Sequence, residues 1–229
     1  GPVWHVSNLG SDYNDGNLDN PFSTIEYAYH RANNNDTILV YPGTFNGGIW
    51  INEKNVILAS LYLLSGDTNY IDSTIIDGFN ETCNLAIYGG IDTTTRVTGF
   101  TIQNGLGCVY GQGGGIYIEN SSPRLDHLII KNNSGGTLGG GICLNGESNA
   151  YINNVVIKNN FSSLGGGGIY SYGSNPVIKN CTIQSNHASR GGGLYLTFSS
   201  PSIENVSITD NTVEEIGGGV LCNSFSNPN

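Results

Sequence analysis

Residues 166–186 contain one full copy of the sequence repeat that decides the fold, Gly166-Gly-Gly-Ile-Tyr-Ser-Tyr-Gly-Ser-Asn-Pro-Val-Ile-Lys-Asn-Cys-Thr-Ile-Gln-Ser-Asn186. Three short runs alternate apolar and polar residues, and Gly, Asn, Ser or Pro separates them. Alternation over a few residues is typical of β-strands, and no longer window keeps a helical period. The stretch therefore predicts three short strands joined by turns.

The same pattern recurs through the second half of the chain. The hydrophobic residues that follow the glycine triplets are spaced by 26, 27, 25 and 26 residues and lie at Ile116, Ile142, Ile169, Leu194 and Val220. Self-similarity at a fixed period is the signature of a solenoid, in which each repeat contacts only its neighbours. We therefore predict an all-β chain that forms a right-handed, single-stranded parallel β-helix with about 26 residues in each coil.

Stacked coils place equivalent residues in columns along the helix axis. Two inward columns are expected, one of Leu125, Ile152, Ile178 and Ile203 and one of Leu128, Val155, Cys181 and Val206. Asn tolerates left-handed turns and its side chains can bond each other from coil to coil. We therefore expect an asparagine ladder at Asn154, Asn180 and Asn205, with His127 as its first rung.

The organisation is expected in three parts. Residues 1–35 hold a strand, an acidic loop and a short capping helix, which opens at the capping box Ser23-Thr-Ile-Glu26 and covers the edge of the first coil. Residues 36–110 form irregular coils, and residues 111–229 form the regular ones. Because the chain ends inside a fifth repeat, we expect either a longer array in the parent protein or self-association through the last coil.

Composition excludes several classes of protein. The 229 residues include 34 Gly, only eight Lys and Arg, and a net charge of -10, so no basic face for nucleic acid is expected. No window approaches about 18 consecutive apolar residues, so no membrane insertion is expected. Five cysteines leave at least one thiol free or paired between chains. The acidic, Asn-rich composition favours an extracellular or cell-surface location.

Two segments carry a family resemblance. Trp4-His-Val-Ser-Asn-Leu-Gly-Ser-Asp-Tyr-Asn-Asp-Gly16, Asn20-Pro-Phe-Ser-Thr-Ile25 and Asp36-Thr-Ile-Leu-Val-Tyr-Pro-Gly-Thr-Phe45 resemble the opening of secreted bacterial right-handed parallel β-helix proteins, which family 9 pectate lyases and chondroitinase-B-like lyases share. The later Gly-Gly-Gly-Ile units are similar to repeats of chlamydial polymorphic outer-membrane proteins. The resemblance implies the fold and leaves the activity open.

A pectate-lyase-like enzyme, by this resemblance, uses Ca²⁺ held by clustered Asp residues and a Lys or Arg as the base. The chain has no Asp-Asp pair, and Lys131 and Lys158 fall at equivalent positions, which predicts that they stack on an outer face. Asp126 and Glu204 are three coil steps apart, roughly 14 Å at normal strand spacing, too far for a shared glycosidic bond. No catalytic residue is therefore assigned.

The best candidate for a metal site is an acidic loop. It carries oxygen-rich side chains around Gly16, at Asp12, Asn14, Asp15 and Asp19. Such groups suit a hard cation such as Ca²⁺, although the spacing departs from an EF-hand loop. Calcium in this loop is the only cofactor that the sequence suggests, and Asx turns alone are the alternative explanation of its composition.

An outward tyrosine stripe is the best candidate for a binding site. Tyr117, Tyr170 and Tyr195 each follow the hydrophobic residue after a glycine triplet, and Cys143 interrupts the column. Aromatic rings can stack on sugar rings, and an acidic surface would prefer neutral or cationic glycans. Alternatively, the rings stabilise the outer face by stacking on one another.

The function that the sequence favours is a non-catalytic scaffold, an adhesin-type module of an extracellular or cell-surface protein. Repeat regularity and the lack of lyase or hydrolase signatures support it. The alternatives are a polysaccharide-active enzyme, either a lyase or a glycoside hydrolase, and a glycan-binding module that uses the tyrosine stripe. A polysaccharide or surface glycan is the expected partner.

Overall fold

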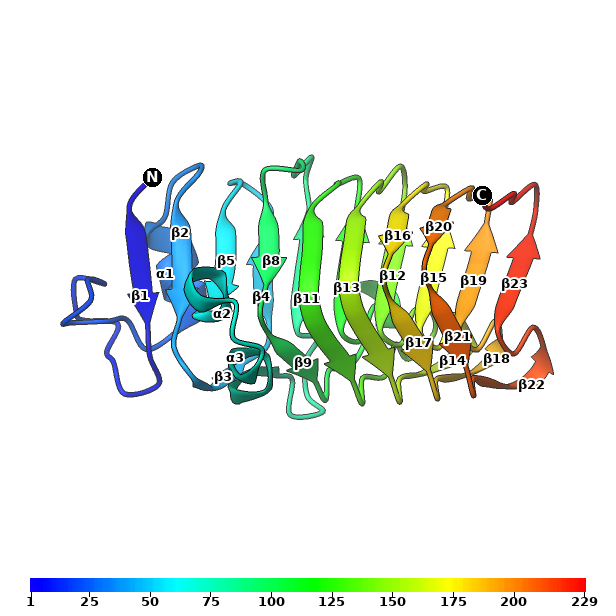
Figure 1. Ribbon diagram of the computed structural model, residues 1–229, viewed down its shortest axis with the longest axis horizontal. Helices are drawn as coiled ribbons and strands as arrows, with labels where there is room; N and C mark the ends of the chain where they lie inside the picture. Colours follow the sequence, from blue (N-terminus) through cyan, green and yellow to red (C-terminus); the bar gives the residue numbers. More distant parts are fainter.

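The computed structural model describes residues 1–229 and shows an elongated stack of coils with parallel strands (Figure 1). The largest sheet, sheet A, has 13 strands. They are β1 (Val3–Val6), β2 (Thr37–Val40), β3 (Gly43–Asn46), β5 (Ile57–Ser60), β6 (Thr74–Asp77), β8 (Arg96–Thr98), β9 (Thr101–Gln103), β11 (Arg124–Lys131), β13 (Tyr151–Lys158), β16 (Val177–Lys179), β17 (Thr182–Gln184), β20 (Ser202–Glu204) and β21 (Ser207–Thr209).

Two smaller sheets complete the coils. Sheet B has seven strands, β4 (Ile49–Ile51), β7 (Leu85–Tyr88), β10 (Ile116–Glu119), β12 (Ile142–Asn145), β15 (Ile169–Tyr172), β19 (Leu194–Thr197) and β23 (Val220–Asn223). Sheet C has three, β14 (Phe161–Gly165), β18 (His187–Arg190) and β22 (Thr212–Ile216). Every strand pair is parallel, so the predicted all-β parallel β-helix is confirmed.

The predicted inward columns form the core. Leu125, Ile152 and Ile178 are in register and fully buried, as are Leu128 and Val155 in the second column. Cys181 is also buried, whereas Ile203 and Val206 of the last coils pack against the core and are only partly buried. These positions have a coil neighbour on one side, and burial in a solenoid needs neighbours on both.

A buried asparagine ladder runs inside the stack. The side-chain amide of each Asn donates to the side-chain oxygen of the next over distances of 2.9–3.0 Å, through Asn84, Asn133, Asn160, Asn186 and Asn211. Each of the last four amides also donates to the carbonyl of a buried isoleucine one coil back. The sequence showed this Asn period without indicating that its side chains point inward.

The expected turn ladder forms only in part. His127, Asn154, Asn180 and Asn205 all adopt positive φ, and Asn154 lies 3.2 Å from the His127 ring nitrogen. Asn180, however, donates to Asn153 instead of Asn154, so the series is broken there. These side chains are exposed apart from that of His127, which is half-buried, and water competes for their hydrogen bonds.

The glycine triplets combine two requirements. The first Gly of each triplet has positive φ, as at Gly139 with φ 66°. The third passes close to the next coil, since a Cβ on Gly141 would lie 2.6 Å from the Gly168 carbonyl oxygen and 3.1 Å from the Asn160 amide. The first position favours Gly because Gly tolerates positive φ, and the third requires Gly because there is no room for a side chain.

Four helical segments lie outside the sheets. Helix α1 (Ile25–Arg31) packs against β1, β2 and β4. Its N-cap is Thr24, whose hydroxyl accepts from the Tyr27 amide, so the predicted capping box that starts at Ser23 is wrong by one residue. Helices α2 (Tyr62–Ser65) and α3 (Asn69–Ser73) form an insertion against sheet A, and a 3₁₀ turn spans Val109–Gly111. No helix is both long and apolar enough to cross a membrane.

One disulfide joins neighbouring coils. Cys83 and Cys108 are bonded, while Cys143 and Cys181 are buried thiols and Cys222 is an exposed one. Three thiols therefore have no disulfide partner within the chain, as the odd number of cysteines requires of at least one. The bond ties down the turn that begins at Asn104 and carries the 3₁₀ segment.

We predict that Asn160→Ala lowers the free energy of unfolding by about 3 kcal/mol, because several buried bonding groups lose their partner. Urea unfolding followed by circular dichroism measures the change. Asn153→Ala is the matched control, since its side chain is half-buried on the outer face, and we expect a loss below about 1 kcal/mol. Equal losses for the two variants would contradict a structural role of the buried ladder.

Candidate functional site

The outer face of sheet A gathers most of the basic residues. Five of the eight Lys and Arg lie on it, at Arg96, Arg124, Lys131, Lys158 and Lys179. They point outward because they alternate along their strands with buried core residues. The sheet A strands from β8 to β21 add only two outward carboxylates, Asp126 and Glu204. This face is therefore basic although the chain is acidic.

The register brings like charges together on this face. Arg96 is the direct neighbour of Arg124, and Lys131 is the direct neighbour of Lys158. Like charges on directly opposed strand positions are destabilising. Neither lysine makes an ion pair, whereas Lys179 pairs with Glu204 at 2.6 Å. The Lys131–Lys158 pair thus offers two uncompensated cations to an anion in solution.

A hydrogen-bonded cluster borders the basic residues. Arg96 donates to both carboxylate oxygens of Asp126, at 2.8 and 2.6 Å, and Thr98 donates to one of them at 3.1 Å. The His127 ring lies 2.9 Å from the same oxygen through Nδ1, and its other nitrogen faces Asn154. Asp126 is almost fully buried, so its carboxylate serves this cluster and not the solvent.

The electrostatics of Asp126 follow from these contacts. Burial opposes ionisation, but the hydrogen bonds of Arg96, His127 and Thr98 and the charge of Arg96 outweigh it and hold the pKa of Asp126 below its usual value. Tyr62 of α2 packs on the His127 ring with centroids 4.7 Å apart. The insertion therefore closes one end of the basic face, as Figure 1 shows with α2 and α3 in front of the early strands.

The sequence predicted part of this face. It placed Lys131 and Lys158 at equivalent outer positions, and the register confirms this. It also placed Asp126 and Glu204 in one outward row, with Asn153 and Lys179 between them, as observed. The Arg96–Asp126–His127 cluster was missed, because Arg96 lies in the irregular coils where no period could align it with Asp126.

The four candidate metal ligands all belong to a loop held by hydrogen bonds. Asp12 accepts from the amides of Ser23 and Thr24, and although partial burial acts the other way, bonds from Thr24 and Ser23 lower its pKa. Asn14 donates to a backbone carbonyl, and Asp15 and Asp19 take part in turns around Asn17. No group of three or more His, Cys, Asp or Glu side chains is placed to hold a metal. Calcium binding by this loop stays a prediction.

The tyrosine stripe is not the exposed row that the sequence suggested. Tyr117 and Tyr170 are 3% and 8% exposed, because turns that carry Cys108, Val109 and Leu138 pack over the column. Burial raises the pKa of Tyr170 to about 12. Only Tyr195 is partly open, at a small hollow with Arg190 and Glu215. The column does point outward, but Tyr117 and Tyr170 are covered by turns, so the three tyrosines do not form an exposed stripe.

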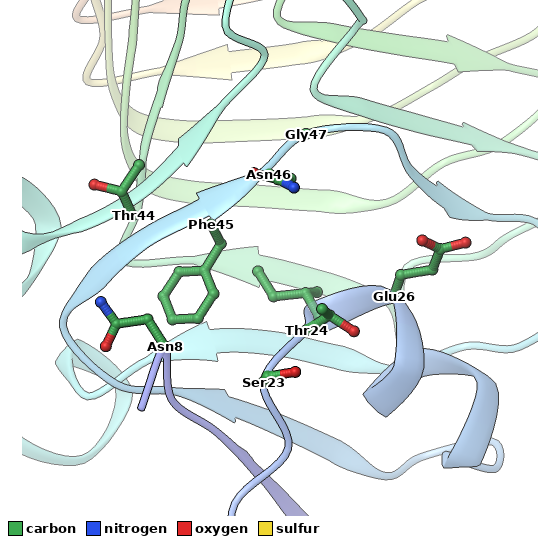
Figure 2. Close-up of a pocket in the computed structure, with 9 residues that line it drawn as sticks. Asn8, Ser23, Thr24, Glu26, Thr44, Phe45, Asn46 and Gly47 are labelled. Atoms are coloured by element: carbon green, nitrogen blue, oxygen red, sulfur yellow. The ribbon is translucent and has the colours of Figure 1, made fainter. Parts of the chain in front are cut away.

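A further hollow of about 200 Å³ lies beneath the N-terminus of α1. Figure 2 shows the Phe45 ring of β3 between Asn8 on one side and Ser23 and Thr24 on the other. Its lining is mostly uncharged, with Glu26 as the one ionised side chain. It holds no pair of acid and base groups, and Asn46 in its wall belongs to the row of sheet A that continues to Lys131 three coils on.

Residues 46–229 match the protein family described as "Right handed beta helix region". The chain belongs to this family. The match confirms the predicted handedness and covers all of the regular coils. A search of curated proteins finds no match to the chain.

Solved structures with the same fold include carbohydrate enzymes. Pectin methylesterase PemA from Erwinia chrysanthemi aligns with a TM-score of 0.58 and 14% identity over 91% of this chain and 66% of its own. A pectin methylesterase in complex with a hexasaccharide gives 0.59 and 12% over 98% and 70%. Pectate lyase Pel9A gives 0.57 and 14% over 90% and 62%. At such identity the likeness shows the fold alone, and the chain spans about two thirds of these proteins' length.

We predict that Asp126→Asn destabilises the protein by about 3 kcal/mol at neutral pH, because Arg96 loses its buried counter-charge. The folded-state pKa of Asp126 is lowered, so its contribution exists above the unfolded value near 3.9 and is lost as the pH falls below it. Urea unfolding between pH 7 and pH 2 measures this. The difference in the free energy of unfolding between wild type and variant should become smaller as the pH falls. A difference that does not change with pH would contradict an ionised Arg96–Asp126 pair.

Proposed function

We propose that this protein is a non-catalytic β-helix module that binds an anionic polysaccharide along the outer face of sheet A. The observation that carries the proposal is the in-register, unpaired Lys131 and Lys158 on a face that also holds Arg124 and Arg96. The repulsion between the two lysines raises the free energy of the unbound protein, and an anion that lies across them relieves it. A chain with one carboxylate per sugar supplies such anions at intervals.

The geometry of the face suits a long ligand. Two rows each carry a pair of cations on neighbouring coils, Arg96 with Arg124 and Lys131 with Lys158, at the strand spacing of about 4.8 Å, so a polymer that lies across these coils meets both pairs. Arg124 lies over the Tyr151 ring at 5.2 Å, which adds an apolar surface beside the charges. Rigid coils fix these groups before binding, which reduces the entropy lost on association.

Two further observations support a carbohydrate ligand outside the cell. The structural neighbours include a pectin methylesterase in complex with a hexasaccharide and a pectate lyase, which places saccharide recognition on this fold in other proteins. The Cys83–Cys108 disulfide is typical of oxidising, extracellular surroundings. An adhesin-type surface module is the setting that we propose.

We favour binding over catalysis because hydrogen bonds within the protein already use both oxygens of the buried Asp126 carboxylate, which is therefore not available to a substrate. Both of its oxygens accept hydrogen bonds from Arg96, and one also serves Thr98 and His127. The alternative is a polysaccharide-active enzyme. It would use Asp126 and His127, since a His that is oriented by an Asp is a familiar general base. Ultraviolet absorbance of unsaturated product from polygalacturonate, with calcium added, would establish the lyase instead.

We predict that the double variant Lys131→Ala, Lys158→Ala weakens binding to polygalacturonate by about fivefold at low salt, since each exposed ion contact contributes up to about 1 kcal/mol. Calorimetry or affinity electrophoresis measures the change. Added salt should reduce the difference between wild type and variant. Arg31→Ala is the control, because Arg31 is an exposed cation on α1 and should leave binding unchanged.

Two results would contradict the proposal. One is equal binding by wild type and the double variant. The other is equal retention on a neutral polysaccharide such as dextran, which would show that charge does not select the ligand. Circular dichroism of each variant checks that the coil stack is intact.

A further inference from the structure

A second cavity, of about 280 Å³, lies beside α1 on the outer side of sheet B. Its walls come from three places, with Glu26 on α1, Trp50 on β4 and Tyr88 on β7, and with Asn52 and Glu53 in the turn after β4. Sites that enclose drug-sized ligands have about 300–1,000 Å³. The cavity therefore suits a single small ring.

The aromatic walls form a corner. Trp50 is 44% exposed although it lies in a strand, and the Tyr88 ring stands perpendicular to it, at 89° with centroids 5.8 Å apart. The Tyr88 hydroxyl accepts from the Asn52 amide at 2.7 Å, which fixes the orientation of the ring. An exposed indole face beside a fixed phenol offers a flat surface on which the apolar face of a pyranose can stack.

The floor of the cavity is held in place by a buried hydroxyl. The Tyr29 oxygen accepts from the backbone amides of Asn52, Glu53 and Lys54 at 3.1–3.2 Å, so the turn is anchored to α1. Tyr29 itself is 4% exposed. The cavity is thus formed before any ligand arrives.

The charges at the rim are acidic. Glu26 on α1 and Glu53 in the turn after β4 are exposed carboxylates of the lining. His30 lies 3.8 Å from Glu26 and is the other titratable group of the lining besides the tyrosines. The nearby Lys54 ammonium is directed at the carbonyls of Tyr29 and His30, which leaves Glu53 without an ion-pair partner.

We propose that this cavity binds a sugar ring that carries a protonated amine, a hexosamine unit of a glycan. The ring would stack on Trp50, and the ammonium would meet Glu26 and Glu53 at the rim. A cation near an indole face gains a further attraction from the ring quadrupole. Neutral rings lack the charge contact, and uronates are repelled by the two carboxylates.

This site is independent of the proposed function. It lies on sheet B and selects positive charge, whereas the basic face lies on sheet A and selects negative charge. Loss of one activity therefore leaves the other intact. If both hold, one module bridges an anionic polysaccharide and an amino-sugar glycan.

Tryptophan fluorescence tests the proposal directly. The chain has two Trp residues, and Trp4 is half-buried, with its indole N–H bonded to Asp36 at 2.9 Å, so Trp50 is the reporter at the cavity. The probes are the disaccharide of glucosamine, its N-acetylated form and a digalacturonate, at physiological salt. We expect saturable quenching by the glucosamine disaccharide, about tenfold weaker affinity for the acetylated form and none for digalacturonate.

Calorimetry of variants locates the site. Trp50→Ala should abolish binding and Trp50→Phe should retain part of it, which separates ring stacking from misfolding. The double variant Glu26→Gln, Glu53→Gln should erase the tenfold preference, while Glu214→Gln, an exposed carboxylate without an ion partner, should not. General attraction to the acidic chain would survive in Trp50→Ala.

Three outcomes would overturn the proposal. The first is the same affinity for the free and acetylated disaccharides, which would mean that the amine is not recognised. The second is binding that persists in Trp50→Ala. The third is no saturable binding of either disaccharide by the wild-type protein.

Discussion

The structure depends on the coil-to-coil pairing of parallel strands around a shared core, and the buried asparagine ladder enforces it. No coil encloses a core alone, so each needs the neighbours whose columns continue its own. At each full rung, such as Asn160, the side chain bonds the rung on either side and a backbone carbonyl one coil back. A coil that slipped by one residue would bury these amides without partners.

Because the strand register is fixed, residues that are one period apart in the sequence lie side by side on the outer face of a sheet. Because each coil repeats the one before, a residue type that recurs every 26 or 27 positions becomes a row along the axis. Lys131 and Lys158 are neighbours for this reason, and the core needs the same register that sets their charges side by side. The irregular coils do not follow this period, so they can hold the inserted helices α2 and α3. Tyr62 of α2 packs on His127 beside the basic face.

The net charge is -10, but the positive and negative side chains are unevenly distributed between the outer faces of sheets A and B. Sheet A presents most of the cations, and the cavity at Trp50 on sheet B presents carboxylates. The expectation that an acidic surface prefers neutral or cationic glycans rested on the net charge alone and not on its distribution over the faces. A solenoid has several long faces that are independent of one another, so each has its own preference for a ligand.

The sequence alone determined the solenoid, its period and the residues of its core, because glycine triplets and alternating apolar residues recur often enough to fix the register. It also placed Lys131 and Lys158 on one outer row. Only the tertiary structure decided which outward side chains stay accessible: turns cover Tyr117 and Tyr170, while Trp50 stays open. It likewise joined Arg96 to Asp126, since contacts between irregular segments depend on loop packing, which no local period records.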